Sequence, residues 1–168
     1  RLFGELLYPY PRELVSIVLA GFLLFIPDYL LEAFDHCMIN LHPALLPKYG
    51  GKGMWGHHVH EAVKAAGEVE TGMTVHWVSR EIDGGEIIAQ FKTAILPTDT
   101  ADDIAAKEHL LEMEHFPKVI EDVVRGLAEE PRPSSLRMAP QRSYERSLGC
   151  HAFSCPYPTI IGAILSCV

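Results

Sequence analysis

Residues 37–56 read Cys-Met-Ile-Asn-Leu-His-Pro-Ala-Leu-Leu-Pro-Lys-Tyr-Gly-Gly-Lys-Gly-Met-Trp-Gly, and the rest of the chain is organised around them. An apolar approach leads into a loop rich in proline and glycine. In an extended strand Asn40 and His42 project to the same side, and Pro43, which lacks a backbone donor, favours a strand end. The pattern predicts an amide and an imidazole at a strand tip, where the ligand crevices of open α/β sheets lie.

The composition is that of a single globular domain of 168 residues, 48% of them hydrophobic and 21% charged. The net charge of −8 argues against a nucleic-acid surface, which normally needs a basic face. Three of the four cysteines lie in the last twenty residues and none forms a CxxC pair. We therefore expect no disulfide framework in the body of the chain and a cytoplasmic location.

The ends of the chain show no secretory signal and no transmembrane stretch. Residues 1–11 lack a long apolar core, and the apolar run 159–168 is shorter than the roughly 20 residues that cross a bilayer. The chain begins at Arg1 without an initiator methionine, so we expect a fragment or a processed product.

A βαβ unit is expected in the first third of the chain. Residues 14–20 form a nearly continuous apolar run ending at Gly21, which is typical of a strand buried on both faces. Pro27 and Asp28 resemble a helix start that runs to Phe34. Residues 37–42 then form the second strand, which gives a right-handed parallel crossover.

The middle of the chain predicts a helix and a hairpin. Residues 57–66 favour a helix that Gly67 ends. Residues 71–79 alternate as a strand, the turn 83–85 is rich in glycine, and residues 86–96 complete the hairpin.

A long helix is expected over residues 101–126, capped by residues 98–100 and kinked or divided at Pro117. Residues 131–135 read as a linker, and no clear period follows. We therefore expect a domain over residues 1–130 and a tail of unknown structure over 131–168.

Asn40, His42 and Asp83 are the strongest candidates for chemistry. An asparagine can donate to an oxyanion, and a histidine can act as acid, base or charge stabiliser near neutral pH. Asp83 lies in a glycine turn, where a carboxylate beside His42 would favour the imidazolium. Each residue alone also fits an ordinary polar strand end or turn, so the local pattern leaves both readings open.

Other histidines carry weaker signals. His57, His58 and His60 with Glu61 would suggest a metal, but no HExxH pattern or fourth ligand is present. Cys150, His151 and Cys155 form a similarly weak cluster. His76 lies in the middle of a strand on a face that leads towards the Asp83 turn. The chain has neither a Walker loop nor a Gly-x-Gly-x-x-Gly fingerprint, so the common nucleotide folds have no support.

Three ordered motifs together resemble the folate-dependent formyltransferase family. They are Asn-Leu-His-Pro-Ala-Leu-Leu-Pro-Lys-Tyr at 40–49, Gly-Met-Thr-Val-His-Trp-Val at 72–78 and Asp-Gly-Gly-Glu-Ile-Ile-Ala-Gln at 83–90. The likeness runs from about residue 15 to residue 126. It implies an α/β fold of three layers, with a Rossmann-like, mostly parallel sheet and flanking helices. The fold is expected to be partial, because the family's opening strand and phosphate loop have no counterpart here.

The resemblance implies an acyl transfer. A formyl group would pass from 10-formyltetrahydrofolate, the co-substrate, to the amine of 5′-phosphoribosylglycinamide in purine biosynthesis, without a metal. The family's catalytic set maps to Asn40, His42 and Asp83, with His76 in support.

The resemblance also implies the binding residues. The folate co-substrate would contact Asn40, Asp83 and two further segments: Leu23, Leu24, Phe25 and Ile26, and Ser79, Arg80, Glu81 and Ile82. The ribonucleotide would contact Lys107, His109 and Glu112. We expect small molecules as the ligands, neither nucleic acid nor membrane as a partner, and a homodimer as one option for the assembly.

Two alternatives stay open on the sequence. A formyltetrahydrofolate deformylase would use water as the acceptor, although the sequence of residues 43–51 favours the glycinamide enzymes. A truncated domain that binds folate without catalysis is the second alternative, since the activity of this chain depends on what surrounds the site.

Overall fold

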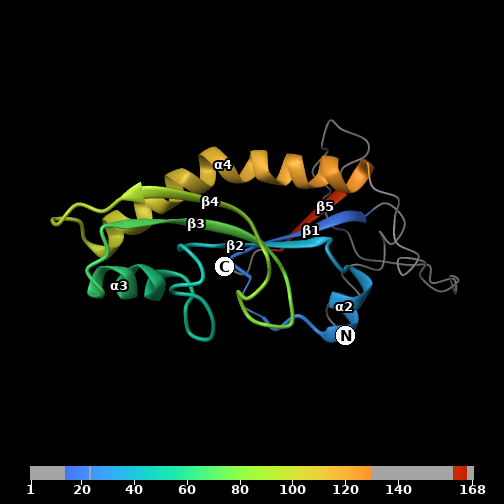
Figure 1. Cartoon of the computed structure of the whole chain (residues 1–168), viewed down its shortest axis with the longest axis horizontal. Helices are drawn as coiled ribbons and strands as arrows, with labels where there is room; N and C mark the ends of the chain where they lie inside the picture. The colour runs from blue at the N-terminus through green and yellow to red at the C-terminus, as the bar shows by residue number, and fades with distance from the viewer. Residues whose placement is uncertain (1–13, 23, 130–160, 166–168) are drawn as a thin grey trace, which may run out of the picture.

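The computed structural model describes residues 14–22, 24–129 and 161–165 and shows a sheet with helices on both sides (Figure 1). In chain order the described elements are β1 (Leu14–Ala20), α2 (Asp28–Ala33), β2 (Met38–His42), α3 (His57–Ala65), β3 (Glu70–Trp77), β4 (Ile87–Ala94), α4 (Ala101–Glu129) and β5 (Ile161–Leu165). None of the helices within these ranges is long and apolar enough to cross a membrane.

The five strands of the described residues form one sheet in the order β4-β3-β2-β1-β5. β1 pairs in parallel with β2 and with β5, whereas β2–β3 and β3–β4 are antiparallel. The α/β class is therefore confirmed, with a mixed sheet whose parallel part follows from the β1–α2–β2 crossover. The β3–β4 hairpin was expected from the glycine turn, and its first strand, β3, is also antiparallel to β2.

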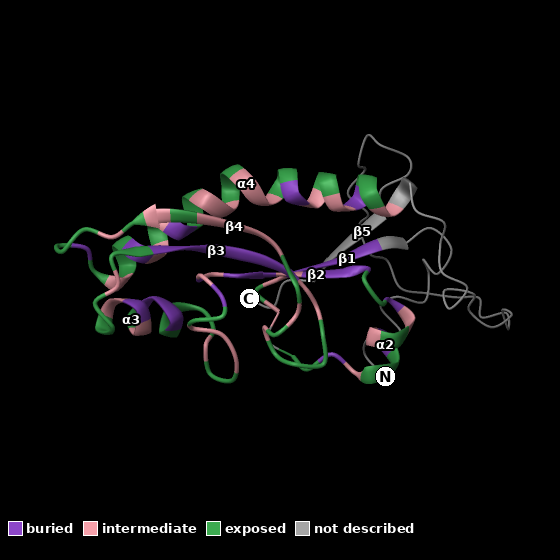
Figure 2. Ribbon diagram, viewed as in Figure 1, coloured by how far each residue is buried: buried purple, intermediate pink, exposed green. Residues whose placement is uncertain are grey.

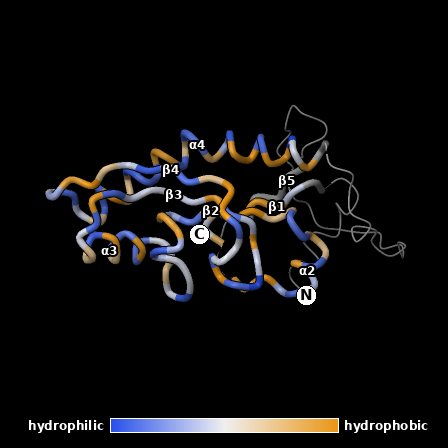
Figure 3. Tube along the Cα trace, viewed as in Figure 1, coloured by the Kyte–Doolittle hydropathy of each residue, from blue (hydrophilic) through white to orange (hydrophobic). Residues whose placement is uncertain are grey.

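The helices complete three layers, as expected. In Figure 1, α4 lies on one side of the strands, and α2 and α3 lie on the other. The side of α4 that faces the sheet is mostly hydrophobic (Figure 3), whereas Leu110 and Met113 of the same helix are exposed. The helix runs unbroken through Pro117, so the predicted division there is absent.

Reciprocal capping begins α4 where the sequence predicts it. The Thr100 amide donates to Asp103 Oδ2 at 2.8 Å, and the Asp103 amide donates to Thr100 Oγ1 at 3.2 Å. These bonds satisfy two of the donors that a helix start leaves without partners.

The core lies along the central strands. β1, β2 and β3 are mostly buried, while β4 at the sheet edge is mostly intermediate (Figure 2). Ile39, Met73 and Val75 are fully buried, and Val119 of α4 packs against them. A second cluster joins α3 to the start of α4 through Val59, Val63 and Ile104. This second contact sets the position of α4 relative to the loop that follows β2.

Strand β5 was not predicted. Residues 161–165 belong to the expected tail, of which residues 131–160 and 166–168 lie outside the described residues. Ile161 pairs with Leu14 and Leu165 pairs with Leu19. The division into a domain and a tail stays a prediction.

Close backbone packing at Gly85 fixes the end of the hairpin. A Cβ atom at Gly85 would lie 1.7 Å from the Trp77 carbonyl oxygen, far inside contact distance. Gly126 in α4 has nothing within 4 Å of the same position.

We therefore predict that Gly85→Ala lowers the free energy of unfolding by about 1–3 kcal/mol, because the hairpin backbone must shift. Gly126→Ala is the control, and it should raise that free energy by up to about 1 kcal/mol, since alanine is the better helix former. Urea unfolding followed by circular dichroism measures both. A Gly85→Ala protein as stable as the wild type would contradict the packing described here.

Candidate active site

Four polar side chains, Asn40, His42, His76 and Asp83, meet at the end of β2, and we call them the polar cluster. Asn40 and His42 come from β2, as their spacing predicts. His76 lies directly opposite Asn40 in the antiparallel β2–β3 pairing. Asp83 enters from the turn between β3 and β4. The structure thus brings together all four residues predicted as the catalytic set.

Short contacts connect the polar cluster. Asn40 Nδ2 lies 3.2 Å from His76 Nε2. The Asp83 carboxylate lies between the two imidazoles, with Oδ2 at 3.5 Å from His42 Nδ1 and Oδ1 at 3.6 Å from His76 Nε2. Both histidine side chains are almost wholly buried, and that of Asp83 is 11% exposed. The charge of Asp83 therefore acts on the two rings with little screening by solvent.

Backbone carbonyls set the tautomers of the two histidines. His42 Nε2 lies 2.7 Å from the Tyr49 oxygen, and His76 Nδ1 lies 2.9 Å from the Trp77 oxygen. Because a carbonyl only accepts, each of these ring nitrogens carries the proton. In neutral His42, the lone pair of Nδ1 then faces the Asp83 carboxylate. A second proton on His42 would turn this contact into an ion pair.

The loop after β2 is held against the hairpin, which positions Tyr49. The Thr74 hydroxyl donates to the Ala44 oxygen at 2.6 Å and accepts from the Leu46 amide at 3.1 Å. Gln90 Nε2 donates to the Leu46 oxygen at 2.8 Å. Because Thr74 and Gln90 belong to the sheet, their hydrogen bonds fix the loop to the sheet and so hold Tyr49 beside His42.

Backbone geometry also fixes Asp83. Its φ of 54° is rare for any residue but glycine, and aspartate is one of the side chains that tolerate it. The Gly51 amide donates to Asp83 Oδ2 at 2.9 Å. A Cβ at Gly50 would approach Asp83 Cβ to 3.2 Å, so the glycine loop packs tightly against this carboxylate.

Burial controls the charge on His42. It lowers the pKa of His42 below the ordinary 6.5, although Asp83 and the Tyr49 carbonyl act to raise it. Asp83 was expected to keep His42 protonated. Asp83 does act to raise the pKa of His42, but the effect of burial is larger and lowers it. For Asp83, burial acts to raise the pKa, but the neighbouring His76, the Gly51 amide and His42 together lower the pKa below its usual value. The free protein thus pairs an ionised Asp83 with a neutral His42.

A pocket of about 730 Å³ opens beside the polar cluster. Its lining includes the polar cluster and the predicted folate-binding residues Leu24, Phe25, Ile26, Ser79, Arg80, Glu81 and Ile82. Leu23 lies outside the described residues. Phe25 is 68% exposed and Ile82 is 51% exposed. Exposed apolar side chains at a pocket mouth offer contact area for a flat, mostly apolar ligand.

Helix α4 supplies the other end of the pocket. His109 and Glu112 line it, and His109 Nδ1 lies 3.0 Å from Glu112 Oε2. Lys107, the third residue predicted to bind the ribonucleotide, is not in the lining. Its Nζ contacts the Asp99 carboxylate and donates to the Ala94 oxygen at 3.2 Å. The structure therefore brings two of these three residues to the pocket.

Sequence reasoning missed several groups that line or hold the site. The Gly51 amide and the Tyr49 carbonyl are backbone groups without a residue-type signal. Glu108 lies one helical turn before Glu112, so the spacing alone places both on one face of α4. His60 was considered only as a metal ligand, and it lines the pocket as a buried side chain.

The histidines of α3 do not assemble into a metal centre. His57 Nε2 and His58 Nδ1 lie 3.7 and 3.3 Å from the Glu61 carboxylate. The described ranges contain no group of three or more His, Cys, Asp or Glu residues arranged to hold a metal ion.

Comparisons of the sequence and of the fold with known proteins both point to one family. Residues 9–120 match the family model described as formyl transferase. The chloroplastic phosphoribosylglycinamide formyltransferases of Vigna unguiculata and Arabidopsis thaliana are 42% and 41% identical over 118 and 129 residues. These matches cover 70% and 71% of this chain but 36% and 43% of the plant proteins.

A solved structure gives the same result. The phosphoribosylglycinamide formyltransferase of Coxiella burnetii is 35% identical, with a TM-score of 0.65 over 74% of this chain and 56% of that one. The chain thus spans about half, or less, of the length of the relatives it matches.

The contacts of Asp83 predict a measurable change in His42. In Asp83→Asn the charge that raises the pKa of His42 is gone, so the pKa should fall further below 6.5. NMR titration of the His42 imidazole resonances in the wild type and in Asp83→Asn measures this change. A rise in the pKa of His42 would contradict the assigned electrostatics.

Proposed function

The chain belongs to the formyl transferase family, and we propose that it transfers a formyl group from 10-formyltetrahydrofolate to the amine of 5′-phosphoribosylglycinamide in purine biosynthesis. The observation that carries the proposal is the meeting of Asn40, His42 and Asp83 at the edge of one pocket. The names of the plant and Coxiella relatives support this choice of acceptor.

In the proposed reaction the amine attacks the formyl carbon. A carbon–nitrogen bond forms to the acceptor, and the bond from the formyl carbon to the folate nitrogen breaks. The proton lost by the amine ends on the departing folate nitrogen. Asn40 Nδ2 would donate a hydrogen bond to the oxyanion of the tetrahedral intermediate, and the positive charge of protonated His42 would stabilise it.

The lowered pKa of His42 fits a role that begins only when negative charge develops. An oxyanion beside the ring favours the imidazolium, and the Asp83 carboxylate already faces Nδ1 at 3.5 Å. His42 would then take up a proton as the intermediate forms and release it to the leaving nitrogen. Asp83 would act through His42 by stabilising that charge.

The two ends of the pocket suggest a division of ligands. The exposed apolar residues Phe25 and Ile82, with neighbouring Leu24, would pack on the ring system of the folate. Glu112 and His109 on α4 would receive the amino end of the ribonucleotide, with the polar cluster between the two ligands.

Location and assembly belong to the same proposal. The cytoplasmic location stays a proposal, and the names of the two plant relatives give the chloroplast for those proteins. A homodimer is likewise a proposal, which sedimentation of the purified chain tests.

Product analysis tests the function directly. We predict that the chain converts 10-formyltetrahydrofolate to tetrahydrofolate only when phosphoribosylglycinamide is present. Formate release without the amine would instead indicate a deformylase. Folate binding without turnover would show a binding domain and would contradict the proposal.

Asn40→Ala tests the oxyanion donor. We predict a loss in kcat of about 10²–10³-fold, the usual effect of removing one such donor, with a much smaller change in KM. His58→Ala is the control, because His58 is exposed and does not line the pocket. Steady-state kinetics measures both, and a loss below about threefold in Asn40→Ala would contradict the assigned role.

Phe25→Ala tests the folate end of the pocket. The phenyl ring is exposed in the free protein, so we predict no loss of stability but about tenfold weaker folate binding, because the bound ring would be removed from water. Tyr29→Ala is the matched control, since Tyr29 is 52% exposed and is not in the pocket lining. Titration calorimetry with a folate measures the affinities. Equal affinities for the two variants would place the folate elsewhere.

A further inference from the structure

Glu108 of α4 is a buried acid that the proposed reaction does not yet use. Its side chain is 3% exposed and lines the pocket. Within the described residues, Oε1 of Glu108 has no hydrogen-bond partner. A buried polar atom without a partner costs free energy, so its position at a pocket wall points to a ligand that completes it.

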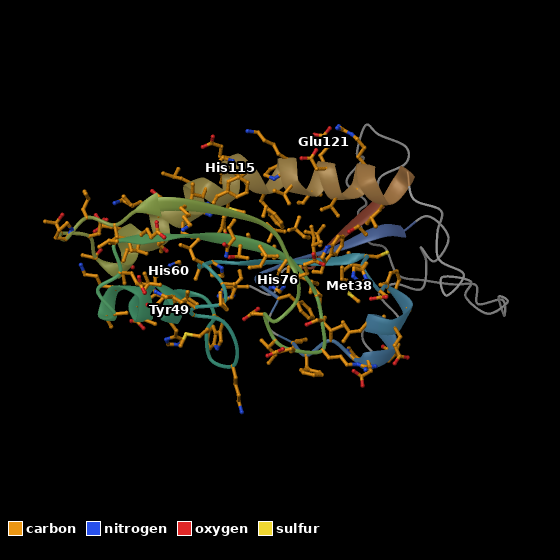
Figure 4. The ribbon with its side chains drawn as sticks, in the orientation of Figure 1. Met38, Tyr49, His60, His76, His115 and Glu121 are labelled. Carbon is orange, nitrogen blue, oxygen red and sulfur yellow. The ribbon has the colours of Figure 1, made fainter. Side chains whose placement is uncertain are left out.

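A second unpartnered atom lies in the same wall. His60 of α3 is 5% exposed and lines the pocket, and no described residue bonds its Nδ1. Figure 4 shows His60 on the α3 side of the strands. The contact of Val59 and Val63 with Ile104 holds α3 against the turn of α4 that precedes Glu108. Two buried side chains that line the same pocket therefore each have a polar atom without a hydrogen-bond partner among the described residues.

The partner of Glu108 is another carboxyl group. Glu112 lies one helical turn further on, within hydrogen-bonding reach of Glu108, and also contacts His109. Burial first, and then Glu112, raise the pKa of Glu108 to about 9. Near neutral pH Glu108 is thus a neutral acid beside Glu112, so the pair carries at most one negative charge.

We propose that Glu108 determines specificity for the amine substrate. Its carboxyl group donates a hydrogen bond to Glu112, and its Oε1 accepts a hydrogen bond from the amine N–H, as a second acceptor beside Glu112. The inference rests on the proposed function, whose amine subsite it completes. No proton or electron leaves the pair in this step.

The charge of the pair explains why the amine fits. Two ionised carboxylates would favour the ammonium form, which has no lone pair with which to attack. A pair with a single negative charge attracts the amine and offers it two acceptor oxygens. The bound ammonium form can still lose its proton and become the nucleophile. A ligand with a hydroxyl group in place of the amine would gain less from the charge, so the pair selects for amines.

The same proton predicts a pH effect on stability. Between pH 4.5 and about 9 the folded chain keeps a proton on Glu108 that the unfolded chain releases. The free energy of unfolding should therefore fall as the pH rises through this window, and Glu108→Gln should reduce the slope. His57 and His60 of α3, His109 and Glu112 of α4 and His42 of β2 line the same pocket, so the comparison is the slope of the variant against that of the wild type.

NMR of the chain labelled with ¹³C at the glutamate carboxyl carbons tests the proposal directly. The resonance that Glu108→Gln removes should titrate near pH 9 and shift when glycinamide, the smallest amine probe, is added. A Glu108 resonance that titrates in the ordinary range and ignores glycinamide would overturn the proposal. This readout needs no turnover, so it decides the inference even if formyl transfer is not observed.

Kinetics provides the second readout. We expect Glu108→Leu to raise the KM for phosphoribosylglycinamide about tenfold or more, as for a lost hydrogen bond to a charged group, with less than a twofold change for the folate. Glu108→Gln, which keeps a donor and an acceptor, should recover most of this loss. Glu121→Leu on the outer side of α4 (Figure 4) is the matched control.

Equal KM values in wild type, Glu108→Leu and Glu121→Leu would overturn the proposal while leaving formyl transfer intact. If Glu108→Leu fails to fold, two other measurements test the proposal: the Glu108 carboxyl resonance of the wild type and the KM of Glu108→Gln, whose side chain is nearly isosteric with that of glutamate. A Glu108→Gln protein that loses as much as Glu112→Gln would also contradict the assigned neutral role.

Discussion

The carboxylate of Asp83 connects the three segments that form the site. It accepts from the Gly51 amide in the glycine loop, faces His42 of β2 at 3.5 Å and faces His76 of β3 at 3.6 Å. Its position depends on a backbone φ of 54° and on the tight packing of Gly85 against Trp77. The hairpin, the loop and the central strand must therefore all be in place before the polar cluster exists.

Two buried acids of opposite character frame the pocket. Asp83 is held ionised, because His76, the Gly51 amide and His42 together lower its pKa by more than burial raises it. Glu108 is held neutral, because burial and Glu112 raise its pKa to about 9. Environments that separate the pKa values of neighbouring carboxyl groups are typical of acid–base sites. In this account Asp83 supports the charge that forms on His42, while Glu108 limits the charge around the amine.

The local patterns of the sequence predicted most of the fold, whereas the polar cluster was predicted from the resemblance of three ordered motifs to the formyltransferase family. The spacing of Asn40 and His42, the apolar run at 14–20 and the glycine turn at 83–85 each act over a few residues, and the structure has the corresponding elements. Strand β5 was missed because its pairing with β1 joins residues far apart in the chain. The burial of Glu108 and the contact of Lys107 with Asp99 depend on how α4 packs on α3 and β4, which no local pattern contains. The pKa of His42 was misjudged for the same reason, since burial rather than a neighbouring charge dominates it.

A crystal structure of the chain with a folate analogue that carries an unreactive formyl group, together with phosphoribosylglycinamide, tests the central claim most directly. We predict that the formyl oxygen lies within about 3 Å of Asn40 Nδ2 and that the amine lies on the side of Glu108 and Glu112. A formyl group bound away from Asn40 and His42, or an amine bound away from α4, would contradict it.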